Sequence, residues 1–216
     1  MKYMIHSCDP RLKYVREYLV PSMIAQGIRE ADITVANDDG HRGCLWSYMD
    51  TFWRLKGDGG VWHLQDDVAI SRDFAEKTAE HDEGIVYGFF HRHKSEEDMI
   101  PGKAPVVTAG YSFPCLRIPN EIAREFAEWF LTDAQFREAY QDKIAEKKYT
   151  DWFWKIFLKE RHRDGYLYNL KPSIVEHVDM LLGGSTVNKW REGWCRATYW
   201  EDEETIEELK RKLAQP

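Results

Sequence analysis

The sequence predicts an α/β fold with a mostly parallel central sheet flanked by helices. Short apolar segments typical of strands alternate with segments of helical periodicity through the first 90 residues, and the connections between them are short. Hydrophobic residues make up 43% of the chain and aromatic residues 14%, with nine Trp, which indicates a folded protein with a sizeable core.

The first half of the chain supplies strands and helices in turn. A strand over 2–8 precedes a helix over 10–27, whose apolar positions recur at helical spacing and which Pro21 interrupts and Gly27 closes. The remaining elements are expected in this order: a strand at 32–37, a helix at 43–56, a strand at 61–64, a helix near 72–80 and a strand at 84–90. This alternation favours a parallel arrangement of the strands.

The second half of the chain is organised differently. Residues 105–119 are expected to be extended. Asn120 is placed to cap a helix, and Thr132 with Gln135 matches a capping box for the next one. Two further helices are expected, beginning near Thr150 and near Glu201. The last of them is charged and amphipathic, which is typical of a surface element.

The chain is expected to form one domain over residues 1–216, because no repeat, linker or break in composition divides it. A net charge of −7 and a pI near 5.7 argue against a broad, non-specific surface for nucleic acid. The four cysteines lie far apart without a C-x-x-C pair, which predicts reduced thiols rather than a zinc ribbon or a disulfide framework. Neither a signal peptide nor a long apolar run is found, so we expect a soluble, cytoplasmic protein.

Two adjacent carboxylates, Asp66 and Asp67, interrupt the apolar stretch VWHLQDDVAI at 61–70. Two anions in such a place are costly unless positive charge compensates them. They follow a predicted strand, and ligands of open parallel sheets bind beyond the carboxyl ends of the strands. A divalent cation such as Mg²⁺ or Mn²⁺ would compensate Asp67. Strand alternation would then turn Gln65 the same way and Asp66 the other. The alternative is that the pair caps the next helix or faces solvent in a turn.

Four segments, taken in order, resemble motifs of a known family. They are the strand end with Asp66 and Asp67, TAGYSF at 108–113, YTDW at 149–152 and PSIVEHVDMLLGGS at 172–185. These segments resemble the D-x-D region, the glycine-containing loop, the x-E-D segment and the C-terminal histidine segment of GT-A glycosyltransferases.

The resemblance covers residues 61 to 185 and implies a GT-A-like, Rossmann-related fold. In that fold a nucleotide-sugar-binding half would occupy about residues 1–90, and an acceptor and catalytic half about residues 105–200. Residues 201–216 would then form the surface helix.

The resemblance also implies a function, that of a metal-dependent glycosyltransferase of the hexosyltransferase type. It would transfer a sugar from a nucleotide-diphospho-sugar, UDP-linked by default, to an acceptor hydroxyl. Asp67 and His177 are the implied ligands of Mn²⁺ or Mg²⁺, and the imidazole favours Mn²⁺. Asp151 is the implied base of an inverting reaction. Two positions depart from the family pattern, since Gln65 and Thr150 stand where the family often has acids.

Polar residues at the ends of the first two strands are candidates for contacts with the nucleotide sugar. Helix N-termini favour phosphate, and the helix that starts near Gly43 follows the second strand. Turn formation explains the same residues equally well. The candidates for donor contacts are Ser7, Asp9, Arg11, Asp38, Asp39, Arg42, Gln65, Asp66 and Gly110.

The sequence leaves the acceptor and two other functions open. A glycan, a protein or a hydroxymethylated base in viral DNA would each supply a hydroxyl, and no membrane partner is expected. A nucleotidyltransferase or pyrophosphatase is an alternative, but HSCDPRLKY is a poor phosphate loop. A non-catalytic protein that binds sugar nucleotides is a further alternative. Gln65 and Thr150 favour it, whereas Asp67, Asp151 and His177 argue against it.

Overall fold

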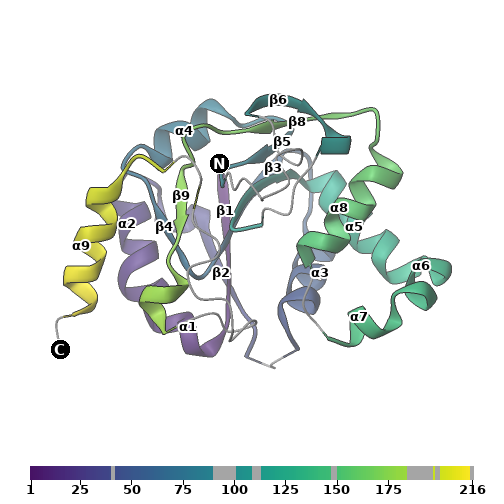
Figure 1. Cartoon of the computed structure of the whole chain (residues 1–216), viewed down its shortest axis with the longest axis horizontal. Helices are drawn as coiled ribbons and strands as arrows, with labels where there is room; N and C mark the ends of the chain where they lie inside the picture. The colour runs from purple at the N-terminus through teal and green to yellow at the C-terminus, as the bar shows by residue number, and fades with distance from the viewer. Residues whose placement is uncertain are drawn as a thin grey trace.

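A seven-stranded sheet runs through the middle of the molecule in the computed structural model (Figure 1). In spatial order its strands are β2 (Ile33–Asn37), β1 (Lys2–Ser7), β3 (Gly60–Gln65), β7 (Cys115–Pro119), β5 (Ile85–Tyr87), β8 (Tyr166–Asn169) and β6 (Gly102–Pro105). Strands β2, β1, β3, β5 and β8 run in one direction, and β7 and β6 run against them. The sheet is therefore mostly parallel, as the sequence predicts. The structure describes residues 1–39, 42–89, 101–108, 113–146, 150–183, 197 and 200–214.

Helices cover both faces of this sheet (Figure 1). One face carries α1 (Asp9–Tyr14), α2 (Val20–Ala25), α4 (Phe74–Glu80) and α9 (Glu203–Leu213). The other face carries α3 (Cys44–Arg54), α5 (Asn120–Thr132), α6 (Ala134–Ala139), α7 (Gln141–Ala145) and α8 (Thr150–Arg161). A second, two-stranded sheet pairs β4 (Val68–Ile70) with β9 (Val175–His177) on the α1 side. Short 3-10 turns occupy Glu30–Asp32, Val106–Thr108 and Asp179–Leu182.

Pro21 does not interrupt the first helical segment. A π-helical turn over Val15–Leu19 joins α1 to α2, and the N–H of Val20 bonds to the carbonyl of Val15. Proline has no N–H and its ring crowds the preceding turn, so a locally wider turn lets the chain continue in helical form. Gly27, with φ of 87°, closes the segment as the sequence predicts.

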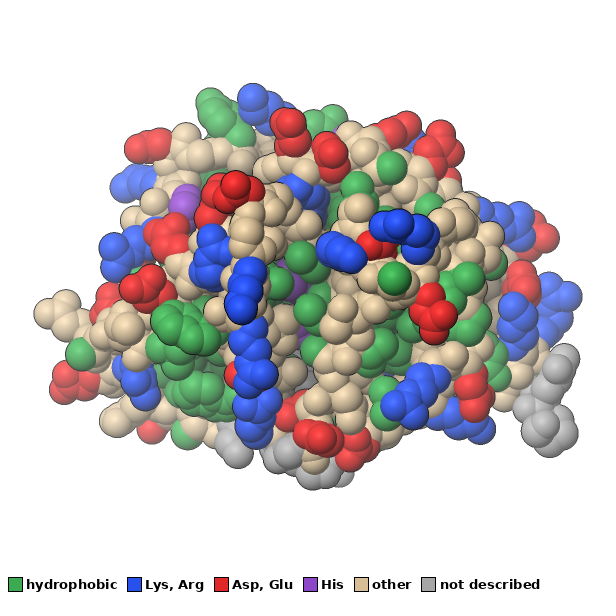
Figure 2. Space-filling model, turned by 180° about the vertical axis from the view of Figure 1, so that it is seen from behind, with side chains coloured by type: hydrophobic (Ala, Val, Ile, Leu, Met, Phe, Trp, Pro, Cys, Tyr) green, Lys and Arg blue, Asp and Glu red, His purple; other side chains and the backbone are tan. Residues whose placement is uncertain are grey.

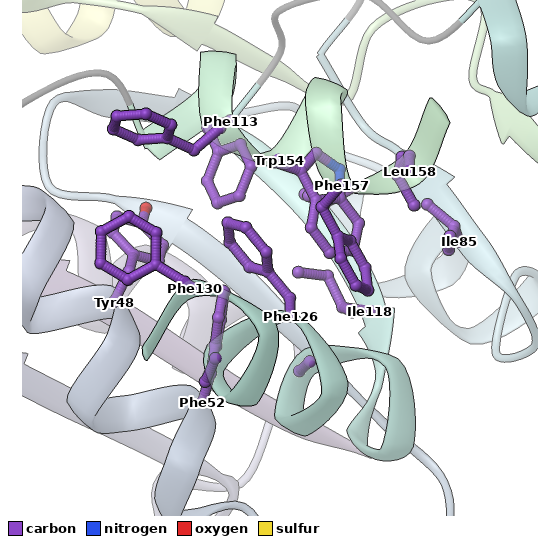
Figure 3. Packing of buried hydrophobic residues seen from close by; sticks show 14 of the residues in the cluster. Tyr48, Phe52, Ile85, Phe113, Ile118, Phe126, Phe130, Trp154, Phe157 and Leu158 are labelled. Atoms are coloured by element: carbon purple, nitrogen blue, oxygen red, sulfur yellow. The ribbon is translucent and has the colours of Figure 1, made fainter. Parts of the chain in front are cut away.

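Successive side chains of a strand point to opposite faces of the sheet, and each face carries its own hydrophobic core. In β5, Ile85 and Tyr87 pack against α3, α5 and α8, whereas Val86 packs on the opposite face with α1 and α4. The first core is strongly aromatic, and Figure 3 shows Phe126 between Phe130 and Trp154. The rings of Phe126 and Trp154 lie 5.1 Å apart in a T-shaped arrangement, a geometry that aromatic pairs prefer.

The structure corrects three local predictions. Asn120 is the first residue of α5 rather than its cap, and its side-chain amide donates to the carbonyl of Lys56. The cap of α6 is Asp133, whose Oδ1 accepts from the N–H of Phe136, so the capping box of Thr132 is wrong. Thr132 is the last residue of α5, and its hydroxyl donates to the carbonyl of Glu128, so Asp133 is the residue placed to cap α6. The C-terminal helix is also more than a surface element, because Ile206 and Leu209 are buried in the second core.

Two histidines are buried between the sheet and α3. His6 Nε2 lies 3.0 Å from His63 Nδ1, and the His6 ring stacks on Tyr48 at 3.6 Å between centroids. Burial lowers the pKa of His63 to about 3, and burial together with the neighbouring histidine lowers that of His6. Both rings are therefore neutral in the folded protein at pH 7.

This histidine pair predicts that the protein loses stability in mild acid. The unfolded state binds protons below about pH 6.5, whereas folded His63 binds none until about pH 3, so stability falls as the pH drops through this window. At pH 5 the loss from His63 alone is about 2 kcal/mol. Urea unfolding of wild type and His63→Gln at pH 7.5 and 5.0 measures it, with His81→Gln as the control. An equal loss of stability in wild type and His63→Gln would contradict the assignment.

Charges of both signs cover the surface. Figure 2 shows the face behind that of Figure 1, where Lys and Arg side chains form a column beside a hydrophobic patch, with acidic side chains around them. No single sign of charge dominates the described part of this face.

Candidate functional site

The two consecutive carboxylates lie at the carboxyl end of β3, next to the end of β1. The two strands are parallel neighbours, with His6 opposite Gln65. Asp66 and Asp67 form a turn between β3 and β4, and both are buried. Because the turn ends the strand, the alternation expected from Gln65 onward does not continue. Gln65 approaches the Tyr48 hydroxyl of α3, whereas Asp67 faces β9. The expectation that Gln65 and Asp67 share one direction is thus wrong.

Asp66 turns toward the end of β1. Its Oδ2 accepts a hydrogen bond from the backbone N–H of Cys8 at 3.0 Å, and Cys8 Sγ lies 3.5 Å from the same oxygen. Burial, and after it the charge of Asp67, raise the pKa of Asp66 to about 6. The Cys8 N–H therefore holds the Asp66 carboxylate at the end of β1, whereas Asp67 turns toward His177 of β9.

Asp67 meets His177 through the small β4–β9 sheet. Val68 is the ladder partner of His177, and the N–H of Val178 donates to the carbonyl of Asp67 at 2.7 Å. This pairing brings Asp67 Oδ1 to 3.2 Å from His177 Nε2, with both side chains 12% exposed. The contact is an ion pair, and Asp67 Oδ1 makes no well-aligned hydrogen bond to any residue the structure describes. The structure thus brings together the two residues that the sequence suggests as metal ligands.

Asp179 lies on the other side of the same imidazole ring. Its Oδ1 is 3.2 Å from His177 Nδ1 and also accepts from the N–H of Met180 at 2.8 Å. Burial alone would lower the pKa of His177, but the charges and contacts of Asp67 and Asp179 outweigh it and raise that pKa well above the usual value. His177 in turn lowers the pKa of Asp179.

Arg11 brings a second positive charge to the cluster. Its side chain is buried, and Nη1 donates to the carbonyl of Leu182 at 2.5 Å. The guanidinium charge favours the ionised forms of Asp66 and Asp179. Arg11 and His177 therefore supply positive charge beside the two buried carboxylates, Asp66 and Asp67. These charges offset the free-energy cost of burying two anions, and they come from segments far apart in the sequence.

The donor atoms at Asp67 and His177 fit a small divalent cation. A carboxylate oxygen and an imidazole nitrogen suit Mn²⁺, and Asp67 Oδ1 is a buried oxygen without a hydrogen bond. Adjacent ligands of an octahedral ion lie about 3 Å apart, close to the 3.2 Å between these atoms. Among the described residues, no group of three or more His, Cys, Asp or Glu forms a metal site. Two protein ligands suffice for a cation whose other ligands are substrate phosphates and water.

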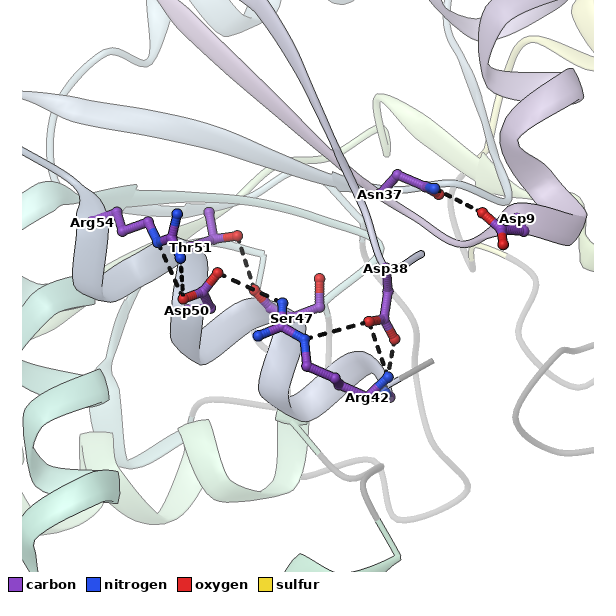
Figure 4. A network of polar contacts seen from close by, with 9 residues as sticks. Asp9, Asn37, Asp38, Arg42, Ser47, Asp50, Thr51 and Arg54 are labelled. Atoms are coloured by element: carbon purple, nitrogen blue, oxygen red, sulfur yellow. Dashed lines mark hydrogen bonds and ion pairs between the residues drawn. The ribbon is translucent and has the colours of Figure 1, made fainter. Parts of the chain in front are cut away.

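A polar network joins the ends of β2 and α3 (Figure 4). The carboxylate of Asp38 accepts from the backbone N–H of Arg42 at 3.0 Å and of Gly43 at 2.7 Å. The Arg42 side chain lies 3.8 Å from Asp38 and 3.6 Å from Asp50. Asp38 and Arg42 therefore shape the turn into α3, which agrees with the alternative that these residues serve turn formation. Their contact with a nucleotide sugar stays a prediction.

Asp151 lies in the first turn of α8, on the α3 side of the sheet. Its Oδ1 accepts from the N–H of Trp152 at 2.9 Å, and its side chain is half-buried. Burial raises the pKa of Cys44 to about 11, and the charge of Asp151 adds to this effect. Burial also raises the pKa of Tyr87, again with a contribution from Asp151. Thr150, the residue before Asp151, places its Oγ1 3.8 Å from Cys44 Sγ, so the start of α8 lies beside the start of α3, the helix that follows β2.

The remaining donor-contact candidates are placed as follows. Ser7 ends β1 and is buried, with its hydroxyl 3.4 Å from the carbonyl of Cys8. Asp9 is exposed at the start of α1 and accepts from Asn37 at 2.8 Å, and Asp39 is exposed. Gly110 lies outside the described residues, as do parts of the segments at 108–113, 149–152 and 172–185.

The sequence analysis missed two residues of this cluster. Asp179 follows His177 by two positions, and a carboxylate so close to an expected metal-ligating histidine is a usable signal. Tyr14 donates its hydroxyl hydrogen to the carbonyl of Val68 at 2.9 Å and so braces the start of β4. No sequence signal distinguishes Tyr14 from the other apolar-face residues of its helix.

Comparison with known proteins shows the fold. No protein-family model and no curated protein matches the chain. Among solved structures, the galactosyltransferase LgtC in complex with donor and acceptor sugar analogs aligns at 13% identity with a TM-score of 0.54, covering 100% of this chain and 97% of LgtC. Residues 1–349 of TarS from S. aureus align at 10% identity with a TM-score of 0.51, covering 85% of this chain. The chain spans 62% of the length of that TarS fragment.

These structural neighbours are glycosyltransferases, and the chain shares with them a mixed α/β fold of the GT-A type. This result confirms the fold class expected from the sequence. Among the helices in the described ranges, none has the length and apolar character needed to cross a bilayer.

Proposed function

We propose that the protein is a metal-dependent glycosyltransferase that transfers a sugar from a UDP-linked donor to an acceptor hydroxyl with inversion. The single observation that supports it best is the pairing of Asp67 with His177 at the carboxyl edge of a GT-A-type sheet. Ligands of open α/β sheets bind at this edge. The fold supplies the expectation of a nucleotide sugar, and the pair supplies a place for the cation that would bind its diphosphate.

Asp67 and His177 would hold Mn²⁺ or Mg²⁺, which when bound stabilises negative charge on the departing diphosphate. Both side chains come from well-paired backbone, so their positions are set before the ligand arrives. Arg11 places a buried positive charge beside them, which favours binding of an anionic group at this edge.

Asp151 would remove the proton from the acceptor hydroxyl. It belongs to the α3 side of the sheet, whereas Asp67 and His177 belong to the α1 side. A sugar bound across the carboxyl edge of the sheet would then meet the cation on one side and the base on the other. General base catalysis of this kind contributes about 10²–10⁴-fold to the rate.

A panel of UDP-, GDP-, ADP- and CMP-linked sugars tests the proposal. We expect slow release of nucleoside diphosphate from one UDP-sugar with Mn²⁺, weaker release with Mg²⁺ and none with EDTA, because a glycosyltransferase uses water when no acceptor is present. The exposed α7 variant Asp142→Asn serves as the control for protein quality.

The products separate the alternatives. Release of nucleoside monophosphate with sugar phosphate would identify a pyrophosphatase. Binding of a sugar nucleotide without any release, even with a range of acceptors, would favour a non-catalytic binding protein. Metal-independent release would contradict the assigned role of Asp67 and His177.

A further inference from the structure

A second carboxylate, Asp179, lies against the side of the His177 ring that faces away from Asp67. His177 Nδ1 is buried, and Asp179 Oδ1 lies 3.2 Å from it, as an ion-pair contact that is not aligned as a hydrogen bond. A charged imidazole carries hydrogen on both nitrogens, and to bind a cation it gives up the hydrogen of one nitrogen and keeps that of the other. A carboxylate at Nδ1 therefore determines what Nε2 presents to the Asp67 side.

Asp179 is itself fixed in position. It opens the 3-10 turn Asp179–Leu182, and its Oδ1 accepts from the N–H of Met180 at 2.8 Å. The far end of this turn is tied to α1, because Arg11 Nη1 donates to the carbonyl of Leu182 at 2.5 Å. Gly183, in the left-handed region with φ of 89°, ends the turn. A short turn held at both ends leaves Asp179 little freedom to leave the ring.

We infer that Asp179 is a positioning residue, which holds the His177 ring with its hydrogen on Nδ1 and Nε2 directed at the cation site. The expected effect on metal affinity rests on the proposed function, whereas the orientation of the ring does not. Carboxylates that orient metal-ligating histidines in this way typically contribute about 10–100-fold to metal affinity. Arg11 would then support Asp179 by holding the end of its turn through the Leu182 carbonyl, in addition to any contact with the nucleotide sugar.

Three variants separate positioning from a simple effect of charge or folding. Asp179→Ala removes both the acceptor and the charge, whereas Asp179→Asn keeps an acceptor oxygen in nearly the same shape. Asp142→Ala removes a carboxylate from the exposed surface of α7 and controls for net charge. We expect Mn²⁺ affinity in the presence of UDP, measured by the EPR signal of free Mn²⁺, to fall about 10–100-fold in Asp179→Ala and only a few-fold in Asp179→Asn.

A double-variant cycle shows whether Asp179 acts through His177. If it does, Asp179→Ala has no further effect on Mn²⁺ affinity once His177→Ala is present. Equal effects of Asp179→Ala in both backgrounds would overturn the inference, because Asp179 would then act on the metal by another route.

A metal-free measurement separates this inference from the proposed function. In protein labelled with ¹⁵N-histidine, we expect a slowly exchanging Nδ1–H signal of His177 in wild type and Asp179→Asn, and its loss in Asp179→Ala. If wild type binds no Mn²⁺ yet shows this pattern, the proposed metal dependence fails and the positioning role stands. A signal that is absent from wild type, or that persists in Asp179→Ala, overturns the positioning role.

Discussion

Asp67→Asn is expected to remove most of the metal-dependent affinity for a nucleoside diphosphate, a loss on the order of 100-fold or about 2.7 kcal/mol. The substitution keeps the shape of the side chain and removes the anionic oxygen that faces His177. Because the substitution also removes one partner of the buried Asp67–His177 ion pair, a thermal melt of each variant shows whether it is folded before binding is compared. Calorimetry with UDP and Mn²⁺, compared with UDP and EDTA, isolates the metal-dependent part.

Variants of His177 and Asp66 show whether the loss in Asp67→Asn is specific to the metal site. His177→Ala should weaken metal-dependent binding less than Asp67→Asn, because a neutral ligand is lost rather than a charged one. Asp66→Asn should alter the placement of the donor more than the metal affinity, since Asp66 is bonded to Cys8 and faces away from the Asp67–His177 contact. Unchanged UDP–Mn²⁺ binding in a folded Asp67→Asn protein would show that the metal site is assigned to the wrong residues.

Asp151→Asn is expected to reduce sugar transfer about 10²–10⁴-fold while donor affinity and melting temperature stay near wild type. An amide cannot accept the acceptor's proton, but it can still accept a hydrogen bond from the N–H of Trp152. The same assignment predicts that the product linkage is inverted relative to the donor. Transfer assays with a defined acceptor, with NMR of the anomeric proton, measure both.

The competing explanation is that Asp151 only stabilises the start of α8. Asp133→Ala provides the matched comparison, because Asp133 caps α6 by accepting from Phe136 at 2.9 Å. Loss of such a cap costs about 1 kcal/mol and leaves transfer per folded molecule intact. If Asp151→Asn behaves like Asp133→Ala, or if the product keeps the donor's configuration, Asp151 is not the base.

The strands and helices of the first half were predictable because their signals are local. The strands at 2–8 and 32–37 and the helix at 43–56 appear where apolar periodicity places them. The helix over 10–27 was predicted to break at Pro21, because a sequence pattern does not reveal that a π-helical turn can absorb the proline. The capping box at Thr132 failed for a related reason, since Asp133 competes for the same N–H groups.

The site was only partly predictable, because its geometry depends on contacts between distant segments. That Asp67 would meet His177 followed from a resemblance, and the structure confirms their contact. What lies opposite Asp66 could not be read from the sequence, since the Cys8 N–H and the Arg11 guanidinium reach it only through the parallel pairing of β1 with β3. Asp179 was within reach of sequence reasoning, two positions from an expected ligand.

The pairing of β4 with β9 limits how the length of this chain can vary during evolution. Side chains alternate along a ladder, so a shift of β9 by one residue would turn His177 away and bring Glu176 or Val178 toward Asp67. The segment that sets this register is pinned at both ends, by Leu170 N–H on the Tyr87 carbonyl and Ile174 N–H on the Gly88 carbonyl. Because Ile174 is held by the Gly88 carbonyl and by the Ser71 N–H, a single insertion or deletion between residues 174 and 177 would turn His177 away from Asp67 without altering any ligand. Homologues that keep this chemistry should keep this spacing constant, even where the sequence around it has diverged.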